Sequence, residues 1–168
     1  VVNSGLKHLV CRAGWMMGGG PQKDKKFVNK IMLQLLKGVK QLHVVNDKDG
    51  TPTYTHDFAL NVKALLEQEY WGLYNMVCAG LTSRLEVATE LVNQLGIADR
   101  VRIEEVNSDY FASDYFAERP LSERLINAKL SLRNSNLMSN WKSALTYYMK
   151  DYYAPEVAKI RNIYQINK

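Results

Sequence analysis

VVNDKDGTPTYTHDFA, residues 44–59, is the stretch that decides the fold of this chain. It continues a short strand predicted at residues 42–45, and its polar residues 46–50 predict a turn. Pro52 has no N–H group to donate, so it belongs at a turn or a sheet edge rather than in a central strand. At residues 55–67 the apolar side chains recur with the 3.6-residue period of a helix. The stretch therefore predicts a strand, a tight turn and a helix, with the turn residues mainly structural.

The same alternation continues on both sides of this stretch. Further strand-like runs lie at residues 9–17, 74–78 and 101–106, and further helical patterns at residues 24–37, 84–95 and 141–152. The helix at 84–95 has the clearest start, because Ser83 and Glu86 form an S-x-x-E capping box. Gly18-Gly19-Gly20 indicates a flexible turn beside a pocket, and Pro155 ends the last clear helix, after which the tail adds a helical turn or frays. Alternating strands and helices predict an α/β fold with about four to five helices, as one domain at residues 1–168.

Composition and charge exclude several classes of protein. The chain is 46% hydrophobic and 23% charged, which is ordinary for a globular protein. Its net charge of +5 comes from 22 scattered basic residues, so we expect no nucleic-acid partner. We expect no membrane partner either, because no run of about 18 apolar residues occurs. Lys7, His8 and Arg12 interrupt the first apolar run, so no signal peptide is expected.

The two cysteines and three histidines form no recognisable reactive group. Cys11 and Cys78 stand alone in apolar runs, without a CxxC pattern, which predicts buried thiols and suits a reducing cytoplasm. His8, His43 and His56 have no spacing that predicts a catalytic triad or a metal centre. We therefore expect no metal site.

Four segments, in order, carry a resemblance to a known family. Cys11-Arg12-Ala13-Gly14-Trp15-Met16-Met17-Gly18 resembles R-x-S-W-[VL]-[YF]-G, and Phe27-Val28 with its helix resembles N-F-[VA]. Residues 44–59 resemble V-x-D-Q-x-G-x-P-T-x-x-x-D-L-A, and residues 119–130 resemble R-P-x-x-S-x-L-x-x-x-K-L. These patterns are typical of the carboxyl-terminal half of dTDP-4-dehydrorhamnose reductases, in the extended short-chain dehydrogenase/reductase superfamily. Gly14 and Met17 depart from the patterns, which place a serine and an aromatic residue there.

The resemblance implies the substrate-binding portion of a Rossmann-like enzyme. In the family, NADPH (or NADH) reduces the C4 ketone of a dTDP-linked 4-keto-6-deoxysugar, and a tyrosine beside a lysine donates the proton. The glycine-rich turn and this Y-x-x-x-K pair precede the first of the four segments, so we expect them upstream of Val1 and assign no catalytic residue here. Tyr164-Gln165-Ile166-Asn167-Lys168 also reads Y-x-x-x-K, but it follows the substrate half, and we interpret it as coincidence.

The resemblance also names candidate site residues. Trp15 is the strongest candidate for a substrate contact, because an indole beside glycines can stack on a sugar ring. Arg119 is the candidate for the diphosphate, since a guanidinium offers paired donors to phosphate oxygens, and Ser122 and Arg124 are weaker candidates. Arg12 and Ala13 would lie near the nicotinamide. Alternatives remain: a core tryptophan at position 15, and surface or ion-paired arginines.

Three hypotheses follow for the function. In the first, the chain is the substrate half of a reductase, inactive alone and binding no cofactor tightly. In the second, it is a non-catalytic module that binds a dTDP-sugar or a related nucleotide-sugar, or another protein. In the third, it belongs to a related epimerase or dehydratase. We also expect self-association, because half of a Rossmann-type fold exposes apolar strand edges and faces.

Overall fold

The computed structural model describes residues 3, 5–114 and 120–165. In chain order its elements are β1 (Leu9–Arg12), β2 (Trp15–Met17), α1 (Gly20–Lys23), α2 (Phe27–Leu36), β3 (Gln41–Val45), β4 (Asp49–Gly50), β5 (Pro52–Tyr54), α3 (Thr55–Glu67), β6 (Gly72–Asn75), β7 (Thr82–Ser83), α4 (Arg84–Leu95), β8 (Arg102–Val106), the 3-10 helix η1 (Ser108–Asp114), α5 (Ala128–Leu132), α6 (Trp141–Tyr152) and α7 (Ala154–Ile163). The mixed α/β class with short strands is confirmed. Helices α3, α4 and α6 begin and end where the sequence predicts.

The strands pair two by two rather than in one wide sheet. β1 pairs with β6, β2 with β5 and β3 with β8, all parallel, and β4 pairs with β7 antiparallel. Within the described residues β1 has β6 as its strand partner on one edge, and no strand lies against the other edge.

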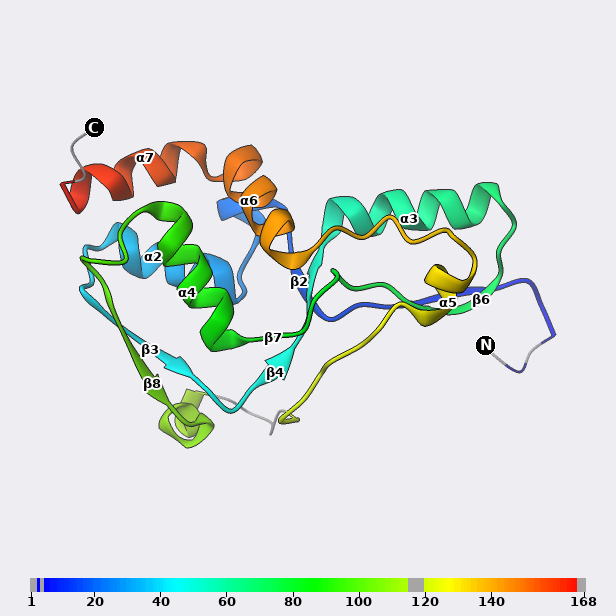
Figure 1. Cartoon of the computed structure of the whole chain (residues 1–168), viewed down its shortest axis with the longest axis horizontal. Helices are drawn as coiled ribbons and strands as arrows, with labels where there is room; N and C mark the ends of the chain where they lie inside the picture. The colour runs from blue at the N-terminus through cyan, green and yellow to red at the C-terminus, as the bar shows by residue number, and fades with distance from the viewer. Residues whose placement is uncertain (1–2, 4, 115–119, 166–168) are drawn as a thin grey trace.

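Two lobes lie side by side along the long axis of the molecule (Figure 1). The helical lobe contains α2, α4, α6 and α7 with the β3–β8 pair. The narrow lobe contains β1, β6, α3 and α5. The β2–β5 and β4–β7 pairs lie at the junction between the two lobes.

The core of the molecule lies mainly in the helical lobe. The 3.6-residue apolar stripes of its helices meet there, and the buried members are Ile31, Met32, Leu35, Ala88, Leu91, Val92, Leu95, Ala144, Leu145, Tyr148 and Ile160. The capping box predicted for α4 is present: the Ser83 hydroxyl accepts from the Glu86 N–H, and the Glu86 carboxylate accepts from the Ser83 N–H. Gly96 closes α4 at a φ of 73°, a conformation that favours glycine.

The strand predicted at residues 9–17 is interrupted. β1 ends at Arg12 and β2 begins at Trp15, and the chain changes partner from β6 to β5 across the gap. Gly14 makes this possible, because a Cβ there would lie 2.2 Å from the Thr51 carbonyl oxygen. The strand predicted at residues 74–78 likewise ends early, at Asn75, since a side chain takes up the next backbone groups, as described below.

Two predictions about helices were wrong at their ends. The helix predicted from Asp24 begins at Phe27, because buried Asp24 accepts hydrogen bonds from the Lys26 N–H and the Tyr148 hydroxyl. The tail after Pro155 forms the ten-residue helix α7, with the proline in its first turn.

The glycine-rich turn, predicted to be flexible and beside a pocket, packs against a helix. Gly20 is buried, begins the short helix α1, and lies against the Tyr152 ring of α6. Its N–H donates to the Tyr148 hydroxyl over 3.2 Å. The turn therefore packs on a helix rather than beside a pocket.

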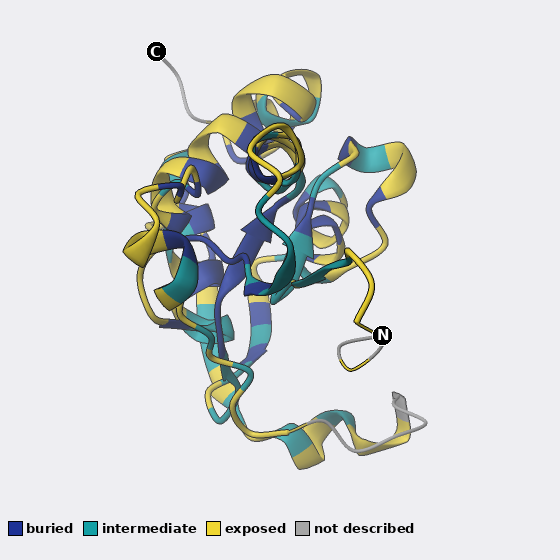
Figure 2. Ribbon diagram, turned by 90° about the vertical axis from the view of Figure 1, so that its right-hand side faces the viewer, coloured by how far each residue is buried: buried dark blue, intermediate teal, exposed yellow. Residues whose placement is uncertain are grey.

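Burial differs sharply along the chain (Figure 2). Buried residues gather in the strands and on the inner faces of the helices, whereas η1 extends away from the body with exposed and half-buried residues. Both cysteines are free thiols; Cys78 is buried, as predicted, whereas Cys11 is only half-buried.

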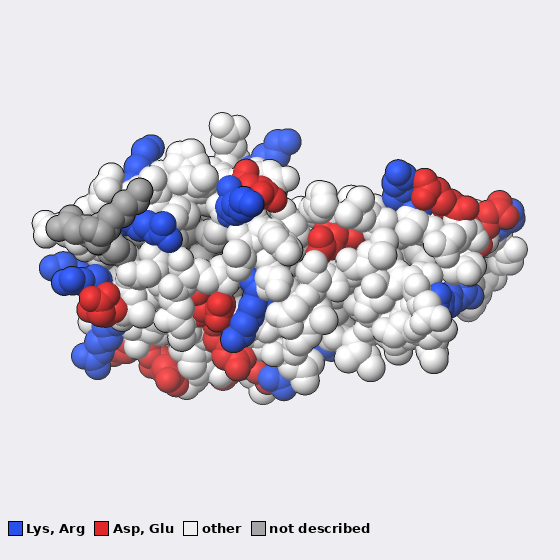
Figure 3. Space-filling view, turned by 45° about the horizontal axis from the view of Figure 1, so that its top comes forward, with Lys and Arg blue, Asp and Glu red and all other residues white. Residues whose placement is uncertain are grey.

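Charged side chains are mixed over the surface. On the face in Figure 3, Lys and Arg side chains alternate with Asp and Glu rather than forming one basic patch. The absence of a nucleic-acid partner stays a prediction. Across the described part of the chain, every helix is too short or too polar to cross a membrane.

Candidate functional site

Strand β4 is the meeting point of three separate segments. Asp49 pairs with β7 on one side and forms a bridge with Ser122 on the other. On that second side, the Asp49 N–H donates to the Leu121 carbonyl over 2.8 Å, and the Asp49 carbonyl accepts from the Glu123 N–H over 2.9 Å. The Asp49 carboxylate pairs with Arg124 at 3.0 Å between Oδ1 and Nη2. The segment 121–124 is therefore held at its backbone and by one ion pair.

The indole of Trp15 completes this group of residues. A Cβ at Gly50 would lie 2.2 Å from Cζ2 of the ring, so the indole lies directly on the Gly50 backbone. The guanidinium of Arg84 lies 4.7 Å from the Trp15 ring centre and 5.0 Å from that of Phe27, which are cation–π distances. The indole N–H donates to Oε2 of Glu123 over 2.7 Å. We call Trp15, Asp49, Gly50, Arg84 and residues 121–124 the β4 cluster.

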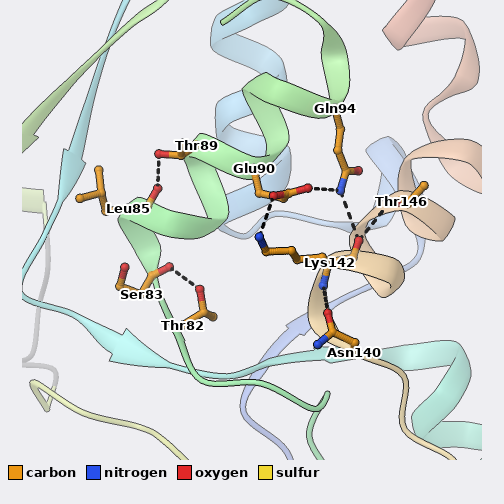
Figure 4. A network of polar contacts seen from close by, with 9 residues as sticks. All are labelled: Thr82, Ser83, Leu85, Thr89, Glu90, Gln94, Asn140, Lys142 and Thr146. Carbon is orange, nitrogen blue, oxygen red and sulfur yellow. Dashed lines mark hydrogen bonds and ion pairs between the residues drawn. The ribbon is translucent and has the colours of Figure 1, made fainter.

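The helix that carries Arg84 is fixed against α6 (Figure 4). Lys142 of α6 pairs with Glu90 of α4 at 3.3 Å, and the Gln94 side-chain amide donates to the Lys142 carbonyl over 3.3 Å. Asn140 caps α6 by accepting from the Lys142 N–H over 2.9 Å. Because both helices are capped and joined, the amino-terminal end of α4 presents Arg84 to Trp15 from a rigid base.

A cavity of about 260 Å³ is lined by the residues that precede β7 and by those that follow the segment 121–124. Residues 77–81 and 125–127, together with Ser131 and Asn136, line it. It begins two residues after the carboxyl end of β6, and ligands of open α/β folds bind outside the carboxyl ends of parallel strands. A Cβ at Gly14 would lie 3.3 Å from a methyl of Val77, so the segment that leads into Trp15 borders the cavity wall.

One buried amide shapes that wall. The Asn127 side chain accepts from the Val77 N–H over 3.0 Å and donates to the Val77 carbonyl over 2.7 Å. It thereby replaces a strand partner, which explains why β6 ends before this residue. Burial raises the pKa of the neighbouring Cys78 thiol to about 12, so Cys78 lines the cavity as a neutral group.

The structure brings together some of the predicted site residues and not others. Ser122 and Arg124 contact Asp49, and Trp15 contacts the neighbouring Gly50 and Glu123, all within the β4 cluster. Arg119 lies outside the described residues. Arg12 is exposed at the end of β1, and Ala13 is half-buried in the interruption that follows. The cofactor role of these last two residues stays a prediction.

Arg84 and Glu123, whose side chains contact the Trp15 indole, were not among the site residues predicted from the sequence. Arg84 carried no signal beyond the first position of a helix, and its aromatic partners come from segments far away in sequence. Glu123 lay inside a matched motif, but nothing in the sequence shows that its carboxylate accepts a hydrogen bond from Trp15.

Tyr164, which begins the terminal Y-x-x-x-K pattern, does not resemble the proton donor of a reductase. The Tyr164 hydroxyl donates to the Val39 carbonyl, and burial raises its pKa, whereas a proton-donating tyrosine of a reductase needs a lowered pKa. Lys168 of the same terminal pattern lies outside the described residues. Burial likewise raises the pKa of Tyr54 and Tyr153, each to about 12. Nor do three His, Cys, Asp or Glu side chains of the described residues group around a common point that could hold a metal.

Comparison with known proteins identifies the family. The family model of the RmlD substrate binding domain matches residues 1–154. The chain belongs to this family. The resemblance to dTDP-4-dehydrorhamnose reductases drawn from the four motifs is therefore confirmed.

Known relatives of this RmlD domain support the assignment to the family. The chain is 31% identical over 137 residues to a dTDP-4-dehydrorhamnose reductase of Mycobacterium tuberculosis, and the match covers 81% of the chain but 43% of that relative. A crystal structure of the Yersinia enterocolitica reductase superposes with a TM-score of 0.76 at 30% identity, covering 91% of the chain and 50% of that protein. A UDP-N-acetylglucosamine 4-epimerase of Bacillus cereus, at 19% identity and a TM-score of 0.66, shares the fold alone. The chain thus spans about half the length of the reductases it matches.

Proposed function

We propose that this RmlD domain is the nucleotide-sugar-binding half of an NADPH-dependent reductase acting on a dTDP-4-keto-6-deoxysugar, and that it is inactive alone. The observation that carries the proposal is the β4 cluster. Trp15 and the segment 121–124 come from two of the four family motifs, and Asp49 and Gly50 come from a third. The fold assembles them at one place beside a cavity.

The chemistry of the site suits part of such a ligand. Arg124 is 40% exposed although it is paired with Asp49, so its other donors can reach a phosphate oxygen. The cavity of about 260 Å³ is smaller than the roughly 300–1,000 Å³ of sites that enclose drug-sized ligands. We therefore assign it to one portion of the nucleotide-sugar, and the rest of the enclosure to a cofactor-binding half.

The residues of this chain do not fit the nicotinamide cofactor by themselves. Gly18 lies against Thr55, and Gly20 against Tyr152, so the glycine-rich turn cannot cradle a pyrophosphate. Arg12 and Ala13 are the residues of this chain that we assign to the nicotinamide cofactor. NADPH would supply the hydride in the complete reductase, and the role of this chain is to bind and orient the sugar.

Titration of the isotope-labelled chain with dTDP-rhamnose, followed by two-dimensional NMR, tests the binding. We expect shifts confined to the Trp15 indole, residues 79–81 and Arg124, and weaker shifts with UDP-glucose. R124Q should weaken binding about tenfold, because a charged hydrogen bond is lost. K150Q, which removes an exposed charge on α6, is the matched control. Absence of shifts in the β4 cluster would contradict the proposal.

The proposal that the chain is inactive alone needs a separate measurement. The chain alone should not accelerate NADPH oxidation at 340 nm with a dTDP-4-keto-6-deoxysugar. Addition of the cofactor-binding half of a related reductase, as one polypeptide with this chain, should restore it. Binding without activity in the joined protein would favour the second candidate, a non-catalytic sugar-nucleotide module.

A further inference from the structure

The contact between Trp15 and Glu123 goes beyond the family pattern. In R-P-x-x-S-x-L-x-x-x-K-L the fifth position is serine, and in this chain the residue at that position is Glu123. Its carboxylate accepts the Trp15 indole N–H over 2.7 Å, across 108 residues of sequence. A serine hydroxyl is attached directly to Cβ, two carbons short of a glutamate carboxylate, and would not reach this N–H from the same backbone position.

The backbone of Glu123 is held independently of this contact. Its N–H donates to the Asp49 carbonyl over 2.9 Å, and the neighbouring Leu121 carbonyl accepts from the Asp49 N–H over 2.8 Å. Arg124 adds an ion pair to the Asp49 carboxylate at 3.0 Å. Since the backbone is fixed on β4, the carboxylate holds the indole rather than following it.

The hydrogen bond selects one orientation of the ring. The Gly50 backbone and the Arg84 guanidinium contact the ring of Trp15, and the Glu123 carboxylate accepts from its N–H edge. Because a hydrogen bond is directional, this acceptor favours the ring orientation that points the N–H toward Glu123. A hydrogen bond with one ionised partner is about twice as strong as one between neutral groups.

We infer that Glu123 is a positioning residue, which orients the Trp15 indole for the bound nucleotide-sugar. It stands at the position where the family pattern has a serine. The inference rests on the proposed function of the β4 cluster. It assigns Glu123 no contact with the ligand; the effect passes through Trp15.

Three substitutions separate this role from a structural one. E123A removes the acceptor, E123S restores the residue of the family pattern, and E123Q keeps an oxygen acceptor at the same reach without the charge. The readouts are the Trp15 indole N–H signal in two-dimensional ¹H–¹⁵N NMR, assigned with W15F, the Kd for dTDP-rhamnose, and the Tm. Trp71 and Trp141 provide the other two indole signals as internal controls.

The expected result is specific. E123A and E123S should move the Trp15 signal upfield and raise the Kd about tenfold, whereas E123Q, which keeps an acceptor but loses the charge, should change both in the same direction by a smaller amount. The Tm of all three should agree within about 2 °C, because Glu123 is half-buried and lies outside the core.

The failures are distinguishable. An unmoved Trp15 signal in E123A, or an altered signal with unchanged Kd, overturns the inference while the proposed binding stands. If the unchanged chain binds no dTDP-rhamnose at all, the proposed function fails and the positioning role fails with it.

Discussion

The helical lobe and the narrow lobe are built from the same kinds of element but differ in how completely they are packed. In the helical lobe, Leu35 and Leu91 are 0% exposed and the helices contact one another directly. In the narrow lobe, β1 has no buried residue, although Leu65 of α3 and Tyr74 of β6 are buried.

Buried polar groups without a hydrogen-bond partner occur in both lobes. Trp71 Nε1, the Tyr74 hydroxyl and Asn75 Oδ1 lie in or just before β6, and Gln94 Oε1 and Glu156 Oε2 lie in α4 and α7. A buried polar group without a partner is costly, so native proteins contain few of them. The lobes therefore differ in apolar packing rather than in unpaired polar groups, because most of the core lies in the helical lobe, whereas β1 of the narrow lobe has no buried residue and no strand against its outer edge within the described residues.

The largest expected effect contrasts one leucine from each lobe. L91A should lower the free energy of unfolding by about 2–5 kcal/mol, because it leaves a cavity in a packed core. L66A on α3 should change it by less than about 0.5 kcal/mol, as at an exposed site. Urea denaturation followed by circular dichroism measures both. Equal losses from the two variants would show that Leu91 contributes no more to stability than an exposed leucine, and that the helical lobe is not tightly packed around it.

A second substitution tests the attachment of the narrow lobe. Asn61 of α3 is 0% exposed, donates to the Ser135 carbonyl over 2.7 Å and accepts from the Leu137 N–H over 2.8 Å. N61L should cost about 2–6 kcal/mol, because one buried and one partly buried backbone group lose their partners at about 1–3 kcal/mol each. Hydrogen exchange should show the loss in α3 before α4. A uniform change across both helices would contradict the division into lobes.

Self-association of the chain should depend on the narrow lobe. Phe58, Val62 and Leu66 line a shallow apolar groove on α3, and β1 of the same lobe has an edge without a strand partner among the described residues. L66K should weaken self-association at least about tenfold, roughly 1.4 kcal/mol, by placing a charge in an apolar contact. L33K on α2 is the matched control, since Leu33 is 48% exposed and Leu66 47%. Light scattering over a range of concentrations measures the effect, and a monomeric unchanged chain would remove its basis.

The smallest expected effect concerns a helix start in the helical lobe. S83A removes the hydroxyl that caps α4 and should cost about 1 kcal/mol. T89A on the same helix is the control, because Thr89 only donates to the Leu85 carbonyl within the helix and alanine is the better helix former. Thermal unfolding of the two variants gives the comparison. A Tm for S83A at or above that of T89A would deny the cap its role.

The sequence by itself determined the elements whose signals are local. Apolar spacing, the capping box at Ser83 and Glu86, and the turn before Thr55 set the bounds of α3, α4 and α6, because helix starts and amphipathic faces depend on neighbours three or four residues away. The family motifs also named Trp15, Ser122 and Arg124, which the fold places close together around β4, and their role in binding stays a prediction.

Tertiary structure decided the rest. The start of α2 moved because Asp24 is held by Tyr148, 124 residues away. The interruption of the first strand depends on Gly14 meeting Thr51, and the early end of β6 on an amide from Asn127. The carboxylate of Glu123 gained its partner only when the fold placed Trp15 at its side. Each of these contacts joins residues distant in sequence, and no local pattern records such a distance.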